Sequence, residues 1–159
     1  MPGTEAAKTI EPDENYILPL GKAALVQQAK EQEVRRGNSL TVITYGMGVY
    51  WAKEASKKFP GAVEIVDLRT LNPLDYETVQ AAVTRHGKAL VLTEEPLLNS
   101  FAESLAGRLS KDCFQFLDAP IYTLGSANLP AVPLNVELEK MMLPNAAKVA
   151  ESMKELLNY

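Results

Sequence analysis

The chain has 159 residues, of which 47% are hydrophobic and 23% charged, a composition typical of one soluble globular domain. Sixteen basic and twenty acidic side chains give a formal net charge of −4, and no basic stripe indicates a nucleic-acid partner. One cysteine, Cys113, and one histidine, His86, exclude a Cys/His zinc site and an internal disulfide. Since no apolar run is long enough for a bilayer or a signal peptide, we expect a cytoplasmic protein without membrane contact.

Residues 1–15 are polar and lack hydrophobic periodicity, so we expect a loosely ordered arm followed by a single domain over residues 16–159. Within that domain, short apolar segments rich in β-branched residues alternate with helical patterns. The expected strands comprise residues 40–45, 63–67, 89–93 and 114–117. Residues 121–124 either extend the last strand or follow it, and residues 22–26 fit a strand as well as a first helical turn.

Helical patterns lie between and after these strands. The expected helices comprise about residues 49–59, 75–86, 99–109 and 145–157. Asp75 is expected to cap the second helix, and Gly87 lies just past its end. Strands joined by helices require parallel pairing with right-handed crossovers. We therefore expect an α/β fold with three layers, α/β/α, in which strand 40–45 lies between strands 63–67 and 89–93.

In open parallel sheets, ligands bind at the carboxyl ends of the strands, so candidate sites are sought in the loops there. Gly46 and Gly48 resemble a dinucleotide-binding turn, but the bulky Trp51 in the following helix favours an ordinary tight turn. Glu94 and Glu95 are candidates for an acid and base, but adjacent side chains point in opposite directions, which favours a solvated or helix-capping pair. No diphosphate-binding or metal-ligand motif is present, so no catalytic, cofactor-binding or metal-binding residue is assigned.

Three further side chains have ordinary structural interpretations. Arg69 is expected to bridge to a carboxylate of a neighbouring loop or subunit rather than to clamp an anion. His86 lies at a predicted helix carboxyl end, where a positive charge is favoured, and no nucleophile-elbow motif offers it a partner. Cys113 precedes an apolar segment and is expected to be buried as packing.

Several motifs occur together in one order and spacing. They are LTVITYGMGV (40–49), VEIVDLRTLNPLD (63–75), TEEP (93–96), FLDAPI (116–121) and LPN (143–145). Together they resemble the C-terminal domain of transketolase-like enzymes. The resemblance covers residues 16–159 and is strongest to the beta subunit, or beta half of a fused chain, of the thiamine-dependent decarboxylating component of 2-oxo acid dehydrogenase complexes.

The resemblance implies a five-stranded, mostly parallel sheet with one antiparallel edge strand. It also implies a larger enzyme that decarboxylates pyruvate or a branched-chain 2-oxo acid and transfers the acyl group to lipoyl groups, with thiamine diphosphate and magnesium bound outside this domain. We therefore expect this chain alone to bind no cofactor and to be inactive. The implied partners are an alpha subunit or alpha half, a second beta chain about a twofold axis, and the lipoate-bearing acyltransferase.

The same resemblance predicts a docking site for the small basic domain of the acyltransferase, because guanidinium groups bind clustered carboxylates. The first candidate docking residue is Asp118, and the secondary candidates are Glu137, Glu139 and Tyr159 with its terminal carboxylate. Apolar side chains beyond the needs of one small core are expected to contact another subunit. They are Tyr50, Trp51, Leu97, Leu98, Phe101, Met141 and Met142.

The chain departs from the family at two positions, since Thr123 and Asn128 stand where an arginine and an aspartate are frequent, so the substrate preference cannot be transferred. Two other functions stay open. One is the equivalent domain of a transketolase or deoxyxylulose-phosphate synthase, which upstream residues would distinguish. The other is a free-standing nucleotide-binding module, which nucleotide soaking would test.

Overall fold

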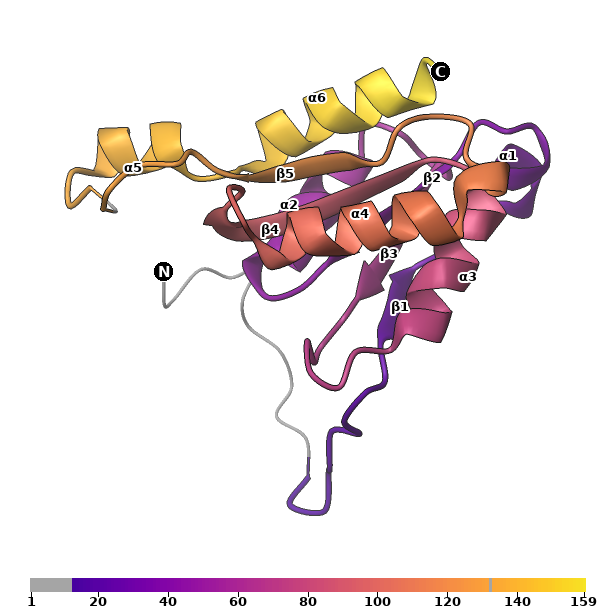
Figure 1. The fold of residues 1–159 in the computed structure, drawn as a ribbon, viewed down its shortest axis with the longest axis horizontal. Coiled ribbons are helices and arrows are strands. Elements are labelled where there is room, and N and C mark those ends of the chain that lie inside the picture. The colour runs from indigo at the N-terminus through magenta and orange to yellow at the C-terminus, as the bar shows by residue number, and fades with distance from the viewer. Residues whose placement is uncertain (1–12, 132) are drawn as a thin grey trace.

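The computed structural model describes residues 13–131 and 133–159, so most of the predicted arm over residues 1–15 lies outside the described residues. A sheet lies between two layers of helices (Figure 1). Its strands are β1 (Ala24–Gln27), β2 (Leu40–Thr44), β3 (Val63–Asp67), β4 (Ala89–Pro96) and β5 (Tyr122–Ser126). The helices are α1 (Glu31–Arg35), α2 (Met47–Ser56), α3 (Tyr76–His86), α4 (Phe101–Asp112), the short 3-10 helix η2 (Phe114–Phe116), α5 (Val136–Met142) and α6 (Ala146–Leu157).

The strand order is β1-β3-β2-β4-β5. Strand β2 lies between β3 and β4, parallel to both, with Leu40 opposite Val63 and Thr41 opposite Ala89. Strand β5 continues the parallel arrangement beside β4, and β1 pairs with β3 in the antiparallel sense. The predicted central strand and the antiparallel edge strand are therefore confirmed, and the segment over residues 22–26 contributes a strand.

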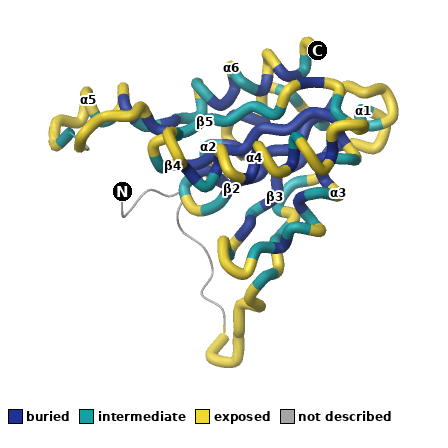
Figure 2. The backbone as a smooth tube through the Cα atoms, viewed as in Figure 1, coloured by how far each residue is buried: buried dark blue, intermediate teal, exposed yellow. Residues whose placement is uncertain are grey.

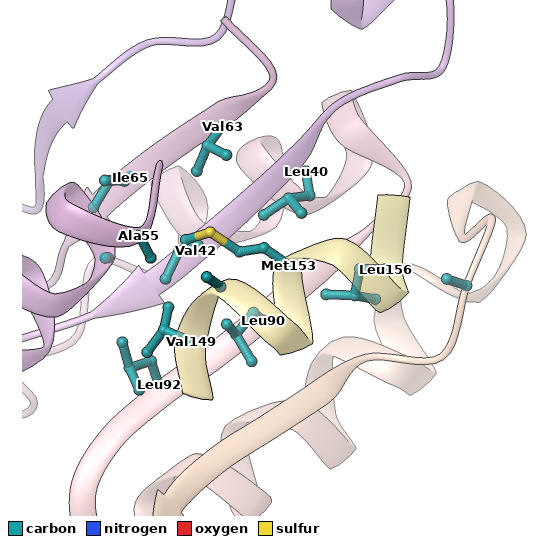
Figure 3. Close-up of a cluster of buried hydrophobic side chains, with 13 residues drawn as sticks. Leu40, Val42, Ala55, Val63, Ile65, Leu90, Leu92, Val149, Met153 and Leu156 are labelled. Carbon is teal, nitrogen blue, oxygen red and sulfur yellow. The ribbon is translucent and has the colours of Figure 1, made fainter. Parts of the chain in front are cut away.

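Both faces of the sheet are buried. On β2, Leu40 and Val42 face a core formed with α2 and α6, and Ile43 faces a second core formed with α3 and α4. Figure 3 shows Met153 of α6 among the strand side chains of the first core. The central strands are accordingly dark blue in Figure 2. This alternation explains why the strands read as continuous apolar runs, because each face needs its own hydrophobic set.

The predicted strand over residues 114–117 is wrong. Helix α4 ends at Cys113, whose N–H donates to the Leu109 carbonyl, and residues Phe114–Phe116 form the 3-10 helix η2. The strand follows later, as β5. The aromatic residues that suggested a strand are exposed, Phe114 to 79% and Phe116 to 46%. Cys113 itself is fully buried, which confirms the expected packing role.

Two short helices were not predicted, α1 before β2 and α5 within the proline-rich segment. In Figure 1, α5 projects from the end of the sheet, and Figure 2 shows that it is largely exposed. Its start is specified locally, because the Asn135 side chain accepts hydrogen bonds from the N–H groups of Glu137 and Leu138. Among residues 13–131 and 133–159, no helix has the length and apolar character needed to cross a membrane.

The ends of α3 carry the predicted capping residues. The Asp75 carboxylate accepts hydrogen bonds from the Thr78 N–H, the Thr78 hydroxyl and the Ala23 N–H, at 3.3, 2.9 and 2.9 Å. The bond from Ala23 is the largest cause that lowers the pKa of Asp75. Gly87 ends the helix with a φ of +67°, a conformation that favours glycine. Asp75 therefore links β1 to α3, and Gly87 turns the chain toward β4.

We expect Gly87→Ala to lower the free energy of unfolding by about 1–3 kcal/mol, because a side chain there is strained and crowded. A Cβ atom at this position would lie 2.3 Å from Asp118 Oδ2 and 3.2 Å from the Phe116 carbonyl oxygen. Urea unfolding followed by circular dichroism measures the change. The matched control is Gly107→Ala, in helix α4 with no atom within 4 Å of the added Cβ, which should be neutral or stabilising by up to about 1 kcal/mol. Equal losses in the two variants would contradict this account.

Candidate functional site

The turn after β2 is an ordinary strand-to-helix turn, as predicted. Gly46 has a φ of +56°, and α2 begins there without a side-chain cap. A Cβ atom at Gly48 would lie 1.9 Å from Thr44 Oγ1, so the second glycine lets α2 approach its own strand. Trp51 is partly buried against the core between α2, α6 and the sheet. The second glycine is therefore buried between helix and strand, whereas in a dinucleotide site the second glycine lets the backbone approach the pyrophosphate.

Two of the three other carboxyl-edge candidates, Glu95 and Arg69, have local partners. Glu95 accepts a hydrogen bond from the Phe101 N–H at 2.9 Å, which places it as a cap of α4. Glu94 is exposed. Arg69 Nε lies 4.0 Å from Asp67 Oδ2, so this side chain faces a carboxylate of its own strand end. The Glu95 contact agrees with the capping interpretation, whereas the carboxylate beside Arg69 belongs to the end of its own strand and not to a neighbouring loop or subunit.

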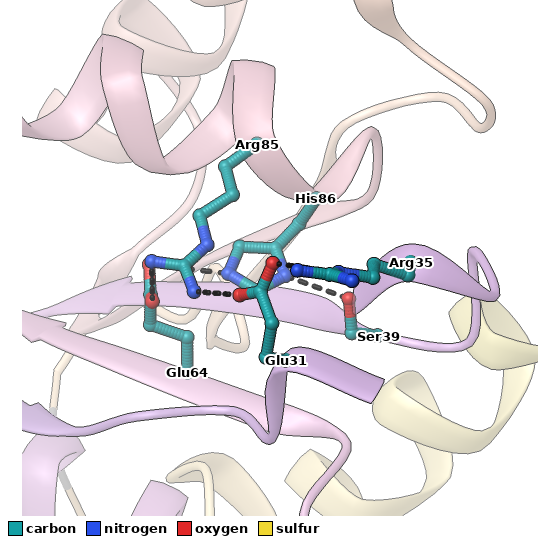
Figure 4. A network of polar contacts seen from close by, with 6 residues as sticks. All are labelled: Glu31, Arg35, Ser39, Glu64, Arg85 and His86. Carbon is teal, nitrogen blue, oxygen red and sulfur yellow. Dashed lines mark hydrogen bonds and ion pairs between the residues drawn. The ribbon is translucent and has the colours of Figure 1, made fainter. Parts of the chain in front are cut away.

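His86 is not a solvated charge at a helix end. It is 3% exposed, with Nδ1 at 2.8 Å from Ser39 Oγ and Nε2 at 3.2 Å from Glu64 Oε1 (Figure 4). Arg85 continues the network, with Nη1 at 3.8 Å from Glu64 Oε2 and Nη2 at 3.1 Å from Glu31 Oε2. The position at a helix end therefore does not fully explain His86, because its main partners lie on β3 and just before β2.

The order serine, histidine, glutamate resembles that of a nucleophilic hydrolase, but this arrangement cannot reach a substrate. Ser39 is 0% and Glu64 3% exposed, and both lie near the amino ends of parallel strands, opposite the edge where such sheets bind ligands. We interpret the network as structural, joining α1, β2, β3 and α3. The sequence carried one signal for it, since Glu64 interrupts an apolar strand buried on both faces and therefore requires a partner.

Among the predicted docking residues, Asp118 lies at the amino end of β5. Its N–H donates to the Gly87 carbonyl at 2.8 Å, and its exposed carboxylate has no ion-pair partner in the described part of the chain. A hollow of about 490 Å³ adjoins it, and we call its rim the Asp118 surface, comprising Phe114, Leu117, Asp118, Pro120 and Ile121. This surface combines an accessible carboxylate with exposed apolar side chains, as protein-binding patches do.

Tyr159 lies near the same end of β5. It is 62% exposed, and its ring contacts that of Tyr122 edge to face at 6.4 Å between centroids. Tyr122 is the first residue of β5 and follows Asp118 by four positions. The chain terminus and the Asp118 surface therefore lie toward the same edge of the sheet.

Glu137 and Glu139 lie elsewhere, on α5. This helix is held beyond the carboxyl end of β5 by a hydrogen bond from the Ala127 N–H to the Met142 carbonyl at 3.1 Å. Glu137 is already paired with Lys140 at 2.9 Å. The four predicted docking residues thus divide into two pairs at opposite ends of β5.

Of the apolar residues predicted to contact another subunit, some are packed within the fold and others are exposed. Phe101 packs edge to face against Tyr45 and Met142 is buried, so both serve the fold. Leu98 and Met141 are 63% and 74% exposed. Further exposed apolar residues, not singled out from the sequence, include Ile17, Leu20, Phe114, Leu134 and Val136. The surface available to another protein is therefore larger than predicted, and it includes the segment before β1 and the surroundings of α5.

Comparison with known proteins identifies the family to which this chain belongs. Residues 29–149 match the family described as transketolase, C-terminal domain, and the chain belongs to that family. A solved structure described as a split gene transketolase, inactive beta4 tetramer, has the same fold, with a TM-score of 0.70 and 15% identity. The alignment covers 92% of this chain and 45% of the transketolase chain.

More similar in sequence are beta subunits of 2-oxo acid dehydrogenases. The 2-oxoisovalerate dehydrogenase subunit beta of Bacillus subtilis is 36% identical over 151 residues, which cover 93% of this chain and 44% of the relative. The pyruvate dehydrogenase E1 component subunit beta of Rhizobium meliloti is 33% identical over 144 residues, which cover 89% and 29%. This chain thus spans less than half the length of either relative.

Proposed function

We propose that this chain is the C-terminal assembly and docking domain of a thiamine diphosphate-dependent 2-oxo acid dehydrogenase that acts in the cytoplasm on pyruvate or a branched-chain 2-oxo acid and acylates lipoyl groups. The observation that carries the proposal is the alignment of nearly the whole chain with beta subunits of both kinds at 33–36% identity. These relatives favour a 2-oxo acid dehydrogenase over a transketolase, whose solved structure is only 15% identical.

The residues present do not fit thiamine diphosphate. The carboxyl-edge loops lack a Gly-Asp-Gly sequence followed by asparagine, and Gly48 packs on Thr44 instead of offering backbone to a diphosphate. The chemistry of decarboxylation therefore belongs to other parts of the enzyme. This domain contributes surfaces that hold an alpha subunit or alpha half, a second beta chain about a twofold axis, and the acyltransferase.

We expect isothermal titration calorimetry of this chain with thiamine diphosphate and magnesium to show no saturable heat, because the domain offers no diphosphate site and no enclosing acid-base pair. A beta subunit with its alpha partner, titrated under the same conditions, is the positive control. Binding of thiamine diphosphate to this chain with a micromolar Kd would contradict the proposal that the cofactor binds to other parts of the enzyme.

Docking of the acyltransferase is proposed for the Asp118 surface, with the carboxylate of Tyr159 as a second acceptor. Asp118 is exposed and lacks a basic partner among the described residues, so a guanidinium group can pair with it without breaking an existing contact. Phe114 and Ile121 supply apolar contact beside it. Glu137 and Glu139 are the weaker candidates, since Glu137 is already paired and both lie at the other end of β5.

A further inference from the structure

A small cavity lies at the topological switch point of the sheet. Strand β2 leads into α2, which packs on one face, and the adjacent strand β4 leads into α4, which packs on the other. In open α/β sheets, ligands bind in the crevice at such a point, outside the carboxyl ends of the strands. The cavity has a volume of about 210 Å³ and is lined by residues after β2, at the end of β4, and at the junction of α5 and α6.

The lining residues combine an apolar wall with negative charge. Met47, Trp51, Leu143 and Pro144 form the apolar part, and Glu94 and Glu139 bring two carboxylates that have no ion-pair partner within residues 13–131 and 133–159. Lys140 also lines the cavity, but its amino group is held by Glu137 at 2.9 Å. The Lys148 ammonium, which donates to the Leu143 carbonyl at 2.8 Å, and the uncapped start of α2, with a partial positive charge of about one half, together bring less charge than the two carboxylates.

We propose that this cavity binds a small organic ammonium ion with an apolar stem. An ammonium group pairs with carboxylates and is attracted to the face of an indole, and Trp51 provides the indole. The apolar stem would cover Met47, Leu143 and Pro144. The cavity is smaller than the 300 Å³ or more typical of drug-sized ligands, which restricts the ligand to a few carbon atoms. The cavity would bind its ammonium ligand independently of acyltransferase docking, because the Asp118 surface lies at the other edge of the sheet.

Trp51 is the only tryptophan of the chain, so its fluorescence reports on this cavity directly. We expect 3-methylbutylamine at neutral pH to change the Trp51 emission saturably, with a Kd of about 1 mM, the range expected for so small a ligand. The isosteric alcohol, 3-methylbutanol, should bind at least about tenfold more weakly because it has no charge. Calorimetry of the same titrations measures binding independently of the fluorescence.

Variants distinguish a charge-specific site from general adsorption of an amine. Glu94→Gln combined with Glu139→Gln keeps the shape of the lining and should weaken amine binding by about tenfold or more. Glu151→Gln removes a charge from an exposed position of α6 outside the cavity and should leave binding unchanged. The proposal is overturned if calorimetry detects no amine binding at 10 mM, about ten times the expected Kd, or if amine and alcohol bind equally. It is also overturned if the double variant and the Glu151→Gln control lose the same affinity for the amine.

Discussion

Replacing Met153 with alanine should lower the free energy of unfolding by about 2–5 kcal/mol, the range for large-to-small changes in a packed core. Met153 is 0% exposed and lies in the core between α2, α6 and the sheet (Figure 3). Truncation removes its apolar contacts and leaves a cavity that neighbouring strands cannot fill. Urea unfolding, with thermal unfolding as a second measure, gives the value.

Met141→Ala is the matched control for this prediction. It removes the same atoms from a side chain that is 74% exposed, so its effect should stay within about 0.5 kcal/mol. A similar loss in both variants would show that α6 does not pack as described.

Glu64→Ala should destabilise the fold by about 3 kcal/mol, because it leaves the buried polar ring of His86 without its carboxylate. Glu64 Oε1 lies 3.2 Å from His86 Nε2, and both side chains are nearly inaccessible to solvent. Circular dichroism during urea unfolding measures the loss, and Glu64→Gln, which retains a polar group and most of the volume, should lose less.

The control for Glu64→Ala is Glu54→Ala. Glu54 also contacts a basic side chain, Lys57, but on the exposed face of α2, where an ion pair contributes only about 0–1 kcal/mol. If Glu64→Ala proved as mild as Glu54→Ala, the network in Figure 4 would not be a buried structural contact.

The sequence predicted the centre of the fold correctly because the strands β2, β3 and β4 are short, apolar and buried on both faces. The capping residue Asp75 and the terminating Gly87 were likewise predicted, since both act through local backbone geometry. The strand proposed over residues 114–117 failed because an apolar segment does not reveal whether its side chains are covered. Phe114 and Phe116 are exposed in this chain, a property of the surface rather than of local propensity.

The site was harder to predict than the fold. The contact between Glu64 and His86 joins residues 22 positions apart, so neither helix capping nor strand alternation reveals it. The position of α5 depends on contacts from elsewhere, including the hydrogen bond of Lys148 Nζ to the Met141 carbonyl at 2.8 Å. The sequence ranked Asp118 before Glu137 as a docking residue through the family resemblance of its segment, but it could not show that the two lie at opposite ends of β5.

Binding of the purified small basic docking domain of a lipoate-bearing acyltransferase to this chain, measured by calorimetry at low salt, tests the proposed function most directly. Asp118→Ala should weaken binding by about tenfold or more, and added salt should weaken binding to the unmodified chain, because exposed charge pairs are screened. Glu137→Ala, which removes a carboxylate at the opposite end of β5, should weaken binding much less than Asp118→Ala does. Unchanged affinity after Asp118→Ala would contradict the assigned surface, and no binding to the unmodified chain would contradict the docking role itself.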